Sequence, residues 1–100
     1  MKLISNAKFG EPVESGTVFR TIDQGIDICI HKIYGCGDAW YLNCNELGIE
    51  NLKLKSENLF RCVDEAKEIL KKQLELLNER FNNFYEDNDV KILRYQESEE

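Results

Sequence analysis

Hydrophobic and polar residues alternate most regularly between Ile26 and His31. Isoleucine occupies positions 26, 28 and 30, and Asp27, Cys29 and His31 occupy the positions between them. A period of two is typical of a half-buried β-strand, because successive side chains point to opposite faces of a sheet. The pattern predicts a strand whose isoleucines face the core.

Shorter segments rich in β-branched and aromatic residues predict further strands on either side. We expect strands at Lys2–Ser5, Thr17–Ile22 and Ala39–Cys44, a short edge strand around Leu52 and Leu54 after an Asn45–Asn51 loop, and a last strand at Val90–Tyr95. The glycine-rich segment Tyr34–Asp38 is typical of a turn, and it would join two of these strands as an antiparallel hairpin.

A second period, close to that of an α-helix, begins after residue 56. Apolar residues follow at steps of 4, 3, 4, 4, 3, 4 and 3, namely Leu59, Val63, Ala66, Leu70, Leu74, Leu77, Phe81 and Phe84. The mean step of about 3.6 places them in one stripe along a helix. The helix is expected from Glu57 to about Tyr85, with Ser56 or Asn58 as its N-terminal cap.

Together these elements predict an α+β fold within residues 1–95, followed by an acidic, disordered tail at 96–100. The fold is a small, mostly antiparallel sheet of three to five strands with one long amphipathic helix packed on one face. The residues expected between sheet and helix are Ile26, Ile28, Ile30, Trp40 and Leu42 on the sheet, and Leu59, Val63, Ala66 and Leu70 on the helix.

The expected helix is longer than the expected sheet. Such a helix would span roughly 40 Å at 1.5 Å per residue, whereas strands of ordinary length span only about 20 Å. The apolar residues from Leu74 to Phe84 therefore extend past the sheet and need another cover. Either the last strand and the N-terminal segment fold back over them, or they form a protein interface.

Charge narrows the range of functions. Thirteen basic residues against nineteen acidic ones give a net charge of −6. This balance argues against direct binding to nucleic acid or to an anionic membrane, since both require a basic surface. No apolar run approaches the roughly 18 residues of a membrane-spanning helix, and the first residues do not have the pattern of a secretory signal.

The four cysteines are Cys29, Cys36, Cys44 and Cys62. They form no C-x-x-C pair, so the usual zinc and thioredoxin-like spacings are missing. Three of them occupy positions that are otherwise apolar, where a free thiol behaves as a small hydrophobic group. We expect reduced, mostly buried thiols in a cytoplasmic protein.

Few residues could carry chemistry, because His31 is the only histidine. With Cys36 and Asp38 it could form a nucleophile, base and orienting carboxylate, and with Cys29 on the same strand face it could contribute to a soft metal site. The alternative for both is a surface histidine near a turn. The segment lacks a helix N-terminus to activate the thiol and an oxyanion donor. We therefore expect no enzyme activity, no metal and no cofactor.

Two features favour binding instead. The apolar end of the helix has Leu77, Phe81, Phe84 and Tyr85 as its candidate anchor. Carboxylates surround that end of the sequence, and those assigned to partner binding are Glu79, Glu86, Asp87 and Asp89. An acidic surface can occupy the basic groove of a nucleic-acid-handling protein. The alternative is a solvated charged face that keeps the protein in solution.

The order of strands followed by a helix resembles the small HicB-like antitoxin domain. Trp40–Gly48 is similar to that family's second strand and the acidic-leucine turn after it, and the segment from Asn58 to Leu70 is similar to its capped helix. The resemblance implies binding to a small RNA-cleaving toxin. Small acidic proteins of this type also include phage-encoded inhibitors of host defence, anti-CRISPR proteins among them.

The sequence therefore predicts a non-enzymatic, acidic protein-binding module that blocks a basic, nucleic-acid-handling partner protein. It would be antitoxin-like or similar to a phage anti-defence protein. The alternative is a structural protein that forms a homodimer with the helix stripe as its seam.

Overall fold

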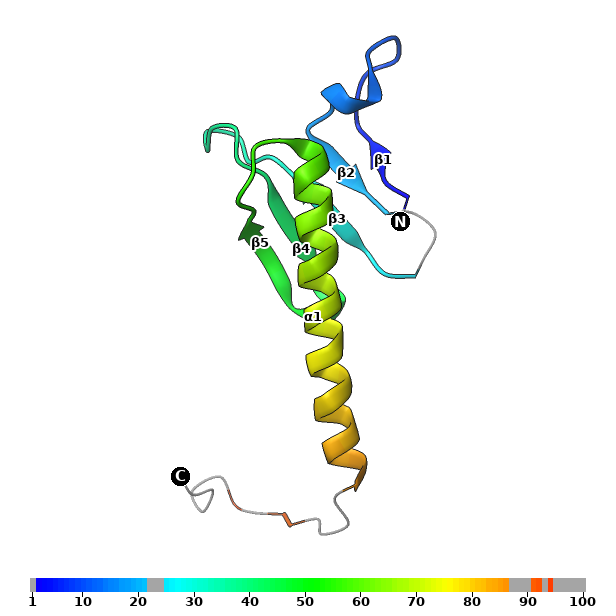
Figure 1. The fold of residues 1–100 in the computed structure, drawn as a ribbon, viewed down its shortest axis with the longest axis vertical. Coiled ribbons are helices and arrows are strands. Elements are labelled where there is room, and N and C mark those ends of the chain that lie inside the picture. Colours follow the sequence, from blue (N-terminus) through cyan, green and yellow to red (C-terminus); the bar gives the residue numbers. More distant parts are fainter. Residues whose placement is uncertain (1, 22–24, 87–90, 93, 95–100) are drawn as a thin grey trace.

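The computed structural model describes residues 2–21, 25–86, 91, 92 and 94. The strands are β1 (Ile4–Ser5), β2 (Val18–Arg20), β3 (Ile28–His31), β4 (Tyr41–Cys44) and β5 (Ile49–Lys53). Short 3-10 helices lie at Val13–Ser15 and Asn45–Leu47, and the helix α1 runs from Leu59 to Glu86. The predicted α+β fold is confirmed, with one helix across one face of a five-stranded sheet (Figure 1).

The sheet is an antiparallel meander in the order β1-β2-β3-β4-β5, so each strand pairs with its neighbour in sequence. In the centre Phe19 pairs with Ile30, and Ile30 pairs with Leu42. Residues directly opposite one another in antiparallel strands share a face. The pairing therefore places these three side chains in one buried row.

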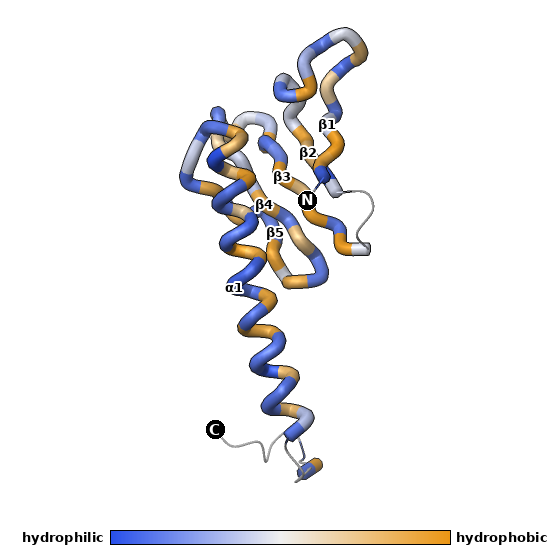
Figure 2. The backbone as a smooth tube through the Cα atoms, turned by 45° about the vertical axis from the view of Figure 1, so that its right-hand side comes forward, coloured by the Kyte–Doolittle hydropathy of each residue, from blue (hydrophilic) through white to orange (hydrophobic). Residues whose placement is uncertain are grey.

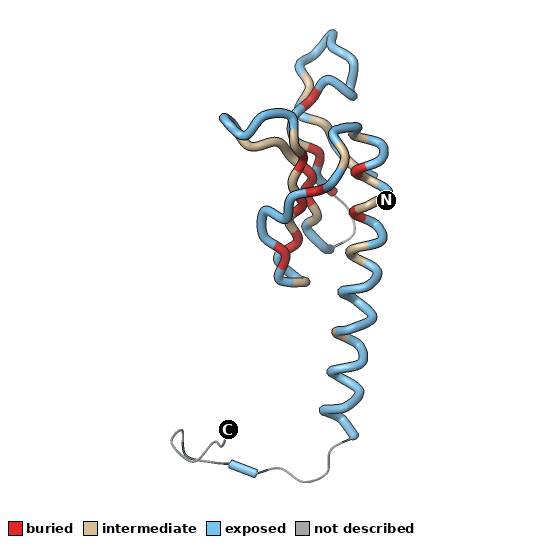
Figure 3. The backbone as a smooth tube through the Cα atoms, turned by 60° about the vertical axis from the view of Figure 1, so that its left-hand side comes forward, coloured by how far each residue is buried: buried red, intermediate tan, exposed pale blue. Residues whose placement is uncertain are grey.

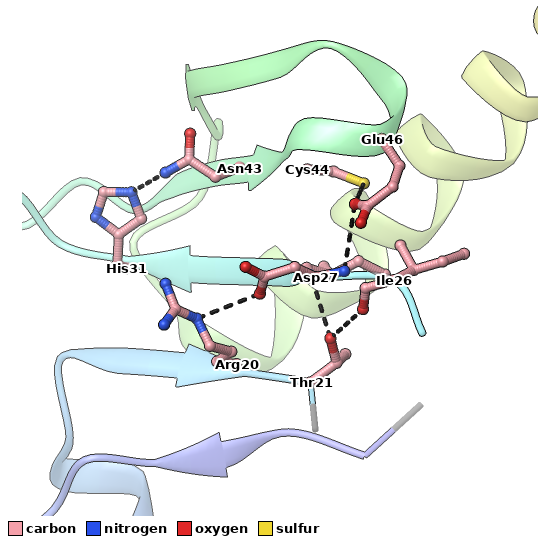
Figure 4. Close-up of polar contacts among 9 residues, drawn as sticks. Arg20, Thr21, Ile26, Asp27, His31, Asn43, Cys44 and Glu46 are labelled. Atoms are coloured by element: carbon pink, nitrogen blue, oxygen red, sulfur yellow. Dashed lines mark hydrogen bonds and ion pairs between the residues drawn. The ribbon is translucent and has the colours of Figure 1, made fainter. Parts of the chain in front are cut away.

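The strand expected from Ile26 begins two residues later, at Ile28. The Thr21 hydroxyl donates a hydrogen bond to the Ile26 carbonyl at 2.7 Å and accepts one from the Ile28 amide at 3.0 Å (Figure 4). This side chain takes the backbone groups that a longer β2–β3 ladder would have used. Ile26 is 44% exposed, so the prediction that it faces the helix as part of the core is wrong.

The last pairing also differs from expectation. The segment expected as an Asn45–Asn51 loop contains a 3-10 helix and the start of β5, which begins at Ile49 rather than near Leu52. Gly48 adopts the left-handed conformation (φ 70°) that reverses the chain between them. Ile49 is consequently buried opposite Cys44, whereas Leu52 is exposed.

The helix begins close to the predicted position. The Asn58 side-chain carbonyl accepts a hydrogen bond from the Arg61 amide at 3.1 Å, and the Ser56 hydroxyl accepts one from the Asn58 amide at 2.9 Å. Asn58 is therefore the N-terminal cap, because it satisfies one of the first amides that lack a helical partner.

The core lies between the sheet and the first half of α1 (Figure 3). Its buried members are Phe19, Ile30, Trp40, Leu42, Cys44, Ile49, Leu54, Cys62 and Ala66. Ile28, Leu59, Val63 and Leu70 are partly buried and pack against this cluster. Apart from Ile26, the residues predicted between sheet and helix are thus found there.

The last strand predicted at residues 90–95 is not formed at its described positions, 91, 92 and 94. Ile92 is 94% exposed, so it adds nothing to the core that would hold a strand in place. Val90, Leu93 and Tyr95 lie outside the described residues, as does the predicted tail at 96–100.

Candidate interaction surface on the distal half of α1

The second half of α1 extends beyond the end of the sheet (Figure 1). Leu70 is the last stripe residue that packs against the core. We call residues 71–86 the distal helix. At 1.5 Å per residue it is about 24 Å long, which is close to half the length of α1.

Hydrophobic positions recur along this projecting segment of the backbone (Figure 2). We call five of them the distal stripe: Leu74, Leu77, Phe81, Phe84 and Tyr85. Leu77 is half-buried, while Phe81, Phe84 and Tyr85 are 50%, 70% and 73% exposed. Exposed aromatic groups at such density mark interaction surfaces more often than isolated apolar residues do.

The aromatic side chains at the helix end contact one another. The ring of Tyr85 stacks on Phe81 with centroids 6.3 Å apart, and it meets Phe84 edge-on at 5.5 Å. Leu77, Arg80, Phe81 and Phe84 line a shallow hollow of about 270 Å³. The helix end therefore presents a preformed apolar surface with one cation, Arg80, at its margin.

The distal stripe faces the same side of α1 as the core. Leu77 and Phe84 follow Leu70 at intervals of seven residues, and such positions drift by only about 20° on a straight helix. The sheet thus covers the first half of a continuous stripe, whereas Leu74, Phe81, Phe84 and Tyr85 in the second half are exposed. The N-terminal segment does not fold back over it, because β1 pairs with β2 at the opposite edge of the sheet from β5.

Of the four carboxylates assigned to partner binding, Glu79 and Glu86 are described, and both are exposed on α1. Asp87 and Asp89 lie outside the described residues. Within residues 71–86, three acidic residues (75, 79 and 86) balance three basic ones (71, 72 and 80). The excess of negative charge lies further along the sequence, where residues 87–100 hold five acidic residues (87, 89, 97, 99, 100) against Lys91 and Arg94.

The three residues that could have formed a catalytic group, His31, Cys36 and Asp38, each interact with a residue outside that group. Asn43 donates its amide N–H to Nε2 of His31 at 2.7 Å (Figure 4). Nδ1 of His31 then carries the proton, and it lies 3.1 Å from the Lys32 carbonyl. Asp38 pairs with Lys32 at 3.9 Å. The Cys36 thiol adjoins Tyr41, and local desolvation together with this thiol raises the pKa of Tyr41. Both nitrogens of His31 are therefore occupied by groups other than Cys36 and Asp38.

The uncovered face of the sheet is polar, and its side chains form hydrogen bonds that the sequence pattern did not reveal. The side-chain oxygen of Asn43 accepts a hydrogen bond of 2.6 Å from the backbone amide of Asn51. The side-chain amide of Asn43 donates one of 3.1 Å to the side-chain oxygen of Asn51. Beside them Arg20 pairs with Asp27 at 3.3 Å, above the buried thiol of Cys29. Burial raises the pKa of Cys29, although the nearby Arg20 acts in the opposite direction. These groups satisfy one another, and they stabilise the sheet.

No group of three or more metal-ligating side chains occurs among the described residues. Arg80 is the member of the interaction surface that sequence reasoning missed. Its position three residues after Leu77 and four before Phe84 was the available signal, because such neighbours meet on a helix surface.

Comparison with known protein families, curated proteins and solved structures finds no match to this chain. The resemblance of Trp40–Gly48 and Asn58–Leu70 to the HicB-like antitoxin domain therefore stays a prediction. Within the part of the chain that the structure describes, no helix has the length and apolar character needed to cross a membrane.

Proposed function

We propose that this protein is a non-enzymatic binding module that docks onto a protein partner through the distal stripe. The partner is a basic protein that handles nucleic acid, and the module blocks its nucleic-acid site in the manner of an antitoxin or a phage anti-defence protein. The free thiols of all four cysteines favour a reducing compartment, so we place the protein in the cytoplasm.

The exposure of Phe81, Phe84 and Tyr85 at the end of a projecting helix carries this proposal. Large aromatic side chains dominate the binding energy of protein interfaces when a partner covers them. In the unbound chain the three aromatic rings already contact one another, so little side-chain conformational entropy is lost on binding.

Charge supports the choice of partner. Residues 87–100, which follow the aromatic end of α1, carry a net charge of −3, half of the −6 of the whole chain. A negative segment that follows an apolar anchor in the sequence would steer the module toward a positively charged surface and discourage acidic partners. Such a surface is the hallmark of proteins that bind nucleic acid.

A tagged full-length chain, incubated with nuclease-treated lysate of its source cells at low and high salt, tests the proposal. We expect capture of a basic nucleic-acid-binding protein that is released at high salt. The double substitution Phe81→Ser with Phe84→Ser should abolish the capture, whereas Phe60→Ser, which removes an exposed aromatic from the first turn of α1, should not. Capture that survives the double substitution would contradict the proposal.

A structural homodimer on the same surface is the second candidate. Leu70, Leu74, Leu77, Phe81 and Phe84 follow at steps of 4, 3, 4 and 3, the spacing of a two-helix seam.

A further inference from the structure

We propose that, before a partner binds, the distal stripe is covered by the distal helix of a second copy of this chain, packed antiparallel about a two-fold axis near residue 79. This inference rests on the proposed function, because both occupants use the same side chains. The dimer would hold the aromatic surface out of water, and a partner would displace one copy to bind the other.

The spacing of the stripe fixes the register. The stripe contains two sets of residues that each repeat every seven positions, namely Leu70, Leu77 and Phe84 in one set and Leu74 and Phe81 in the other. In an antiparallel seam, residues of one set pack against residues of the other set in the second copy. Leu77 of one copy then lies against Phe81 of the second copy, and Leu74 lies against Phe84. Both pairs are centred on residue 79, so the two-fold axis generates each of them twice.

The position of the sheet makes the fit self-complementary. The sheet lies on the stripe side of α1 and ends near Leu70. With the axis near residue 79, Glu86 of the second copy lies beside residue 72 of the first. The distal helix of the second copy therefore covers the stripe from the point where the sheet ends. Because helix pairs pack about 8–10 Å apart, this helix lies in the same layer as the sheet of the first copy.

A parallel pair is excluded by the same geometry. Each sheet lies on the seam side of its own helix, so a parallel arrangement would place both sheets in the space between the two helices. Straight helices that touch at their distal ends cannot separate far enough within the length of one sheet to admit two sheets. An antiparallel pair avoids this, because its sheets lie at opposite ends.

The area available indicates a weak dimer. Three aromatic side chains that are 50–73% exposed, together with Leu74 and Leu77, offer roughly 400–500 Å² per copy, on the scale of 150–250 Å² for a fully buried aromatic. The total of about 800–1,000 Å² lies at the lower limit for specific association. A dissociation constant in the micromolar range suits a contact that a tighter partner displaces.

Sedimentation equilibrium of the purified full chain, from about 1 µM to about 1 mM, tests the association across the affinity range of weak interfaces. We expect a shift from monomer to dimer across this range. Leu77→Glu should weaken the dimer by roughly a hundredfold, because it places a charge in the seam beside Phe81 of the second copy. The matched control is Leu76→Glu, which changes an exposed leucine outside the distal stripe, about 100° around the helix from Leu77, and should leave the association unchanged.

Spin-label distances test the orientation. Cys36 is the one exposed cysteine, so the native chain can be labelled there. An antiparallel pair keeps the two helix starts, and with them the Cys36 labels, about 60 Å apart at 1.5 Å per residue. Labels on Asn82→Cys in a Cys36→Ser background should lie within about 25 Å of each other, since residue 82 is only three positions from the axis. Adjacent Cys36 labels would overturn the antiparallel arrangement.

The two proposals fail separately. A chain that remains monomeric at about 1 mM overturns the dimer, yet it leaves capture of a basic partner intact. Conversely, the double variant Phe81→Ser with Phe84→Ser could abolish the dimer and still capture the basic partner. That result would show that the partner does not bind through the distal stripe, and it would contradict the proposed function. In the captured complex, one copy of this chain per partner supports displacement, and two copies contradict it.

Discussion

The indole Nε1 of Trp40 donates a hydrogen bond of 3.1 Å to the backbone carbonyl of Glu57. Trp40 precedes β4, and Glu57 lies just before the cap of α1. This bond therefore ties the buried edge of the hairpin to the point where the helix starts. The ring also packs against Phe19 with centroids 5.7 Å apart.

Replacing Trp40 with Phe should destabilise the fold by about 1–3 kcal/mol, because it removes this bond, leaves the Glu57 carbonyl without its partner and opens a small cavity. Urea denaturation followed by circular dichroism measures the change. Tyr34→Ser removes a fully exposed aromatic from the neighbouring turn and should change the free energy of unfolding by less than about 0.5 kcal/mol. Equal losses in the two variants would contradict the proposed anchoring of the helix.

Two asparagines of the helix region should respond with opposite signs. Asn58→Ala removes the cap of α1 and should cost about 1 kcal/mol, because the Arg61 amide loses its acceptor. Asn82→Ala lies on an exposed turn of the distal helix and should raise helicity, since alanine is favoured over asparagine by up to about 0.7 kcal/mol. Thermal melts monitored at 222 nm would show the two shifts, and a neutral Asn58→Ala would rule out its role as the cap.

Gly16 is a buried residue of the loop that joins β1 to β2, and a Cβ there would meet the Ser5 hydroxyl and lie 2.7 Å from Oδ1 of Asn6. Asn6 uses that oxygen to accept hydrogen bonds from the amides of Thr17 and Val18. Gly16→Ala should therefore destabilise the protein by about 1–3 kcal/mol through overpacking. The denaturant midpoint measures the loss, and its partial recovery in the pair Gly16→Ala with Ser5→Ala would locate the clash.

Alkaline pH should destabilise the protein through its buried thiols. Burial raises the pKa of Cys29, Cys44 and Cys62 from the ordinary value of 9.0. Well below pH 9.0 the thiols are protonated in both states. As pH approaches and passes that value, the unfolded chain releases protons that the folded chain retains, so the free energy of unfolding falls.

Urea midpoints measured between pH 7 and pH 10 would show this decline, which continues until the folded-state thiols also ionise. The matched comparison is Cys62→Ala, which removes one of the three buried thiols and should make the decline shallower. Constant stability to pH 10 would mean that the three thiols are accessible to water in the folded chain.

Core and distal stripe should differ sharply in their effect on stability. Leu54→Ala should cost about 2–5 kcal/mol, because Leu54 is 2% exposed and belongs to the core cluster. Phe84→Ser should cost less than about 1 kcal/mol at protein concentrations where the chain is monomeric, since the ring is 70% exposed. Chemical denaturation measures the free energy of unfolding of the two variants. A large decrease for Phe84→Ser would show that the distal stripe is part of the core.

Local sequence predicted the helix better than the strands. The cap at Asn58 and the stripe from Leu59 to Phe84 are properties of the helix itself, so they could be read without knowing what the helix packs against. Strand ends depend on which side chain captures a backbone group across the sheet. Thr21 does so where β3 begins, and Asn43 does so at the register shift between β4 and β5. Neither contact is visible until the strand register is known.

The candidate surface was predictable for a similar reason. Its exposure follows from a comparison of lengths, since a helix of 28 residues cannot be covered by strands of two to five residues. The sequence could not show at which residue the sheet stops covering α1. This point is set by Leu70, the last stripe residue that packs against the core.

Because only the first half of α1 is held by the sheet, its amide hydrogens should exchange with solvent at two very different rates. Amides before Leu70 can open only when the core opens, so they should report global unfolding. The distal helix has about 16 residues, close to the marginal length of an isolated helix in water, and its amides should exchange by local fraying. Slower exchange confined to residues 71–86 would then mark the moment at which the distal helix is covered.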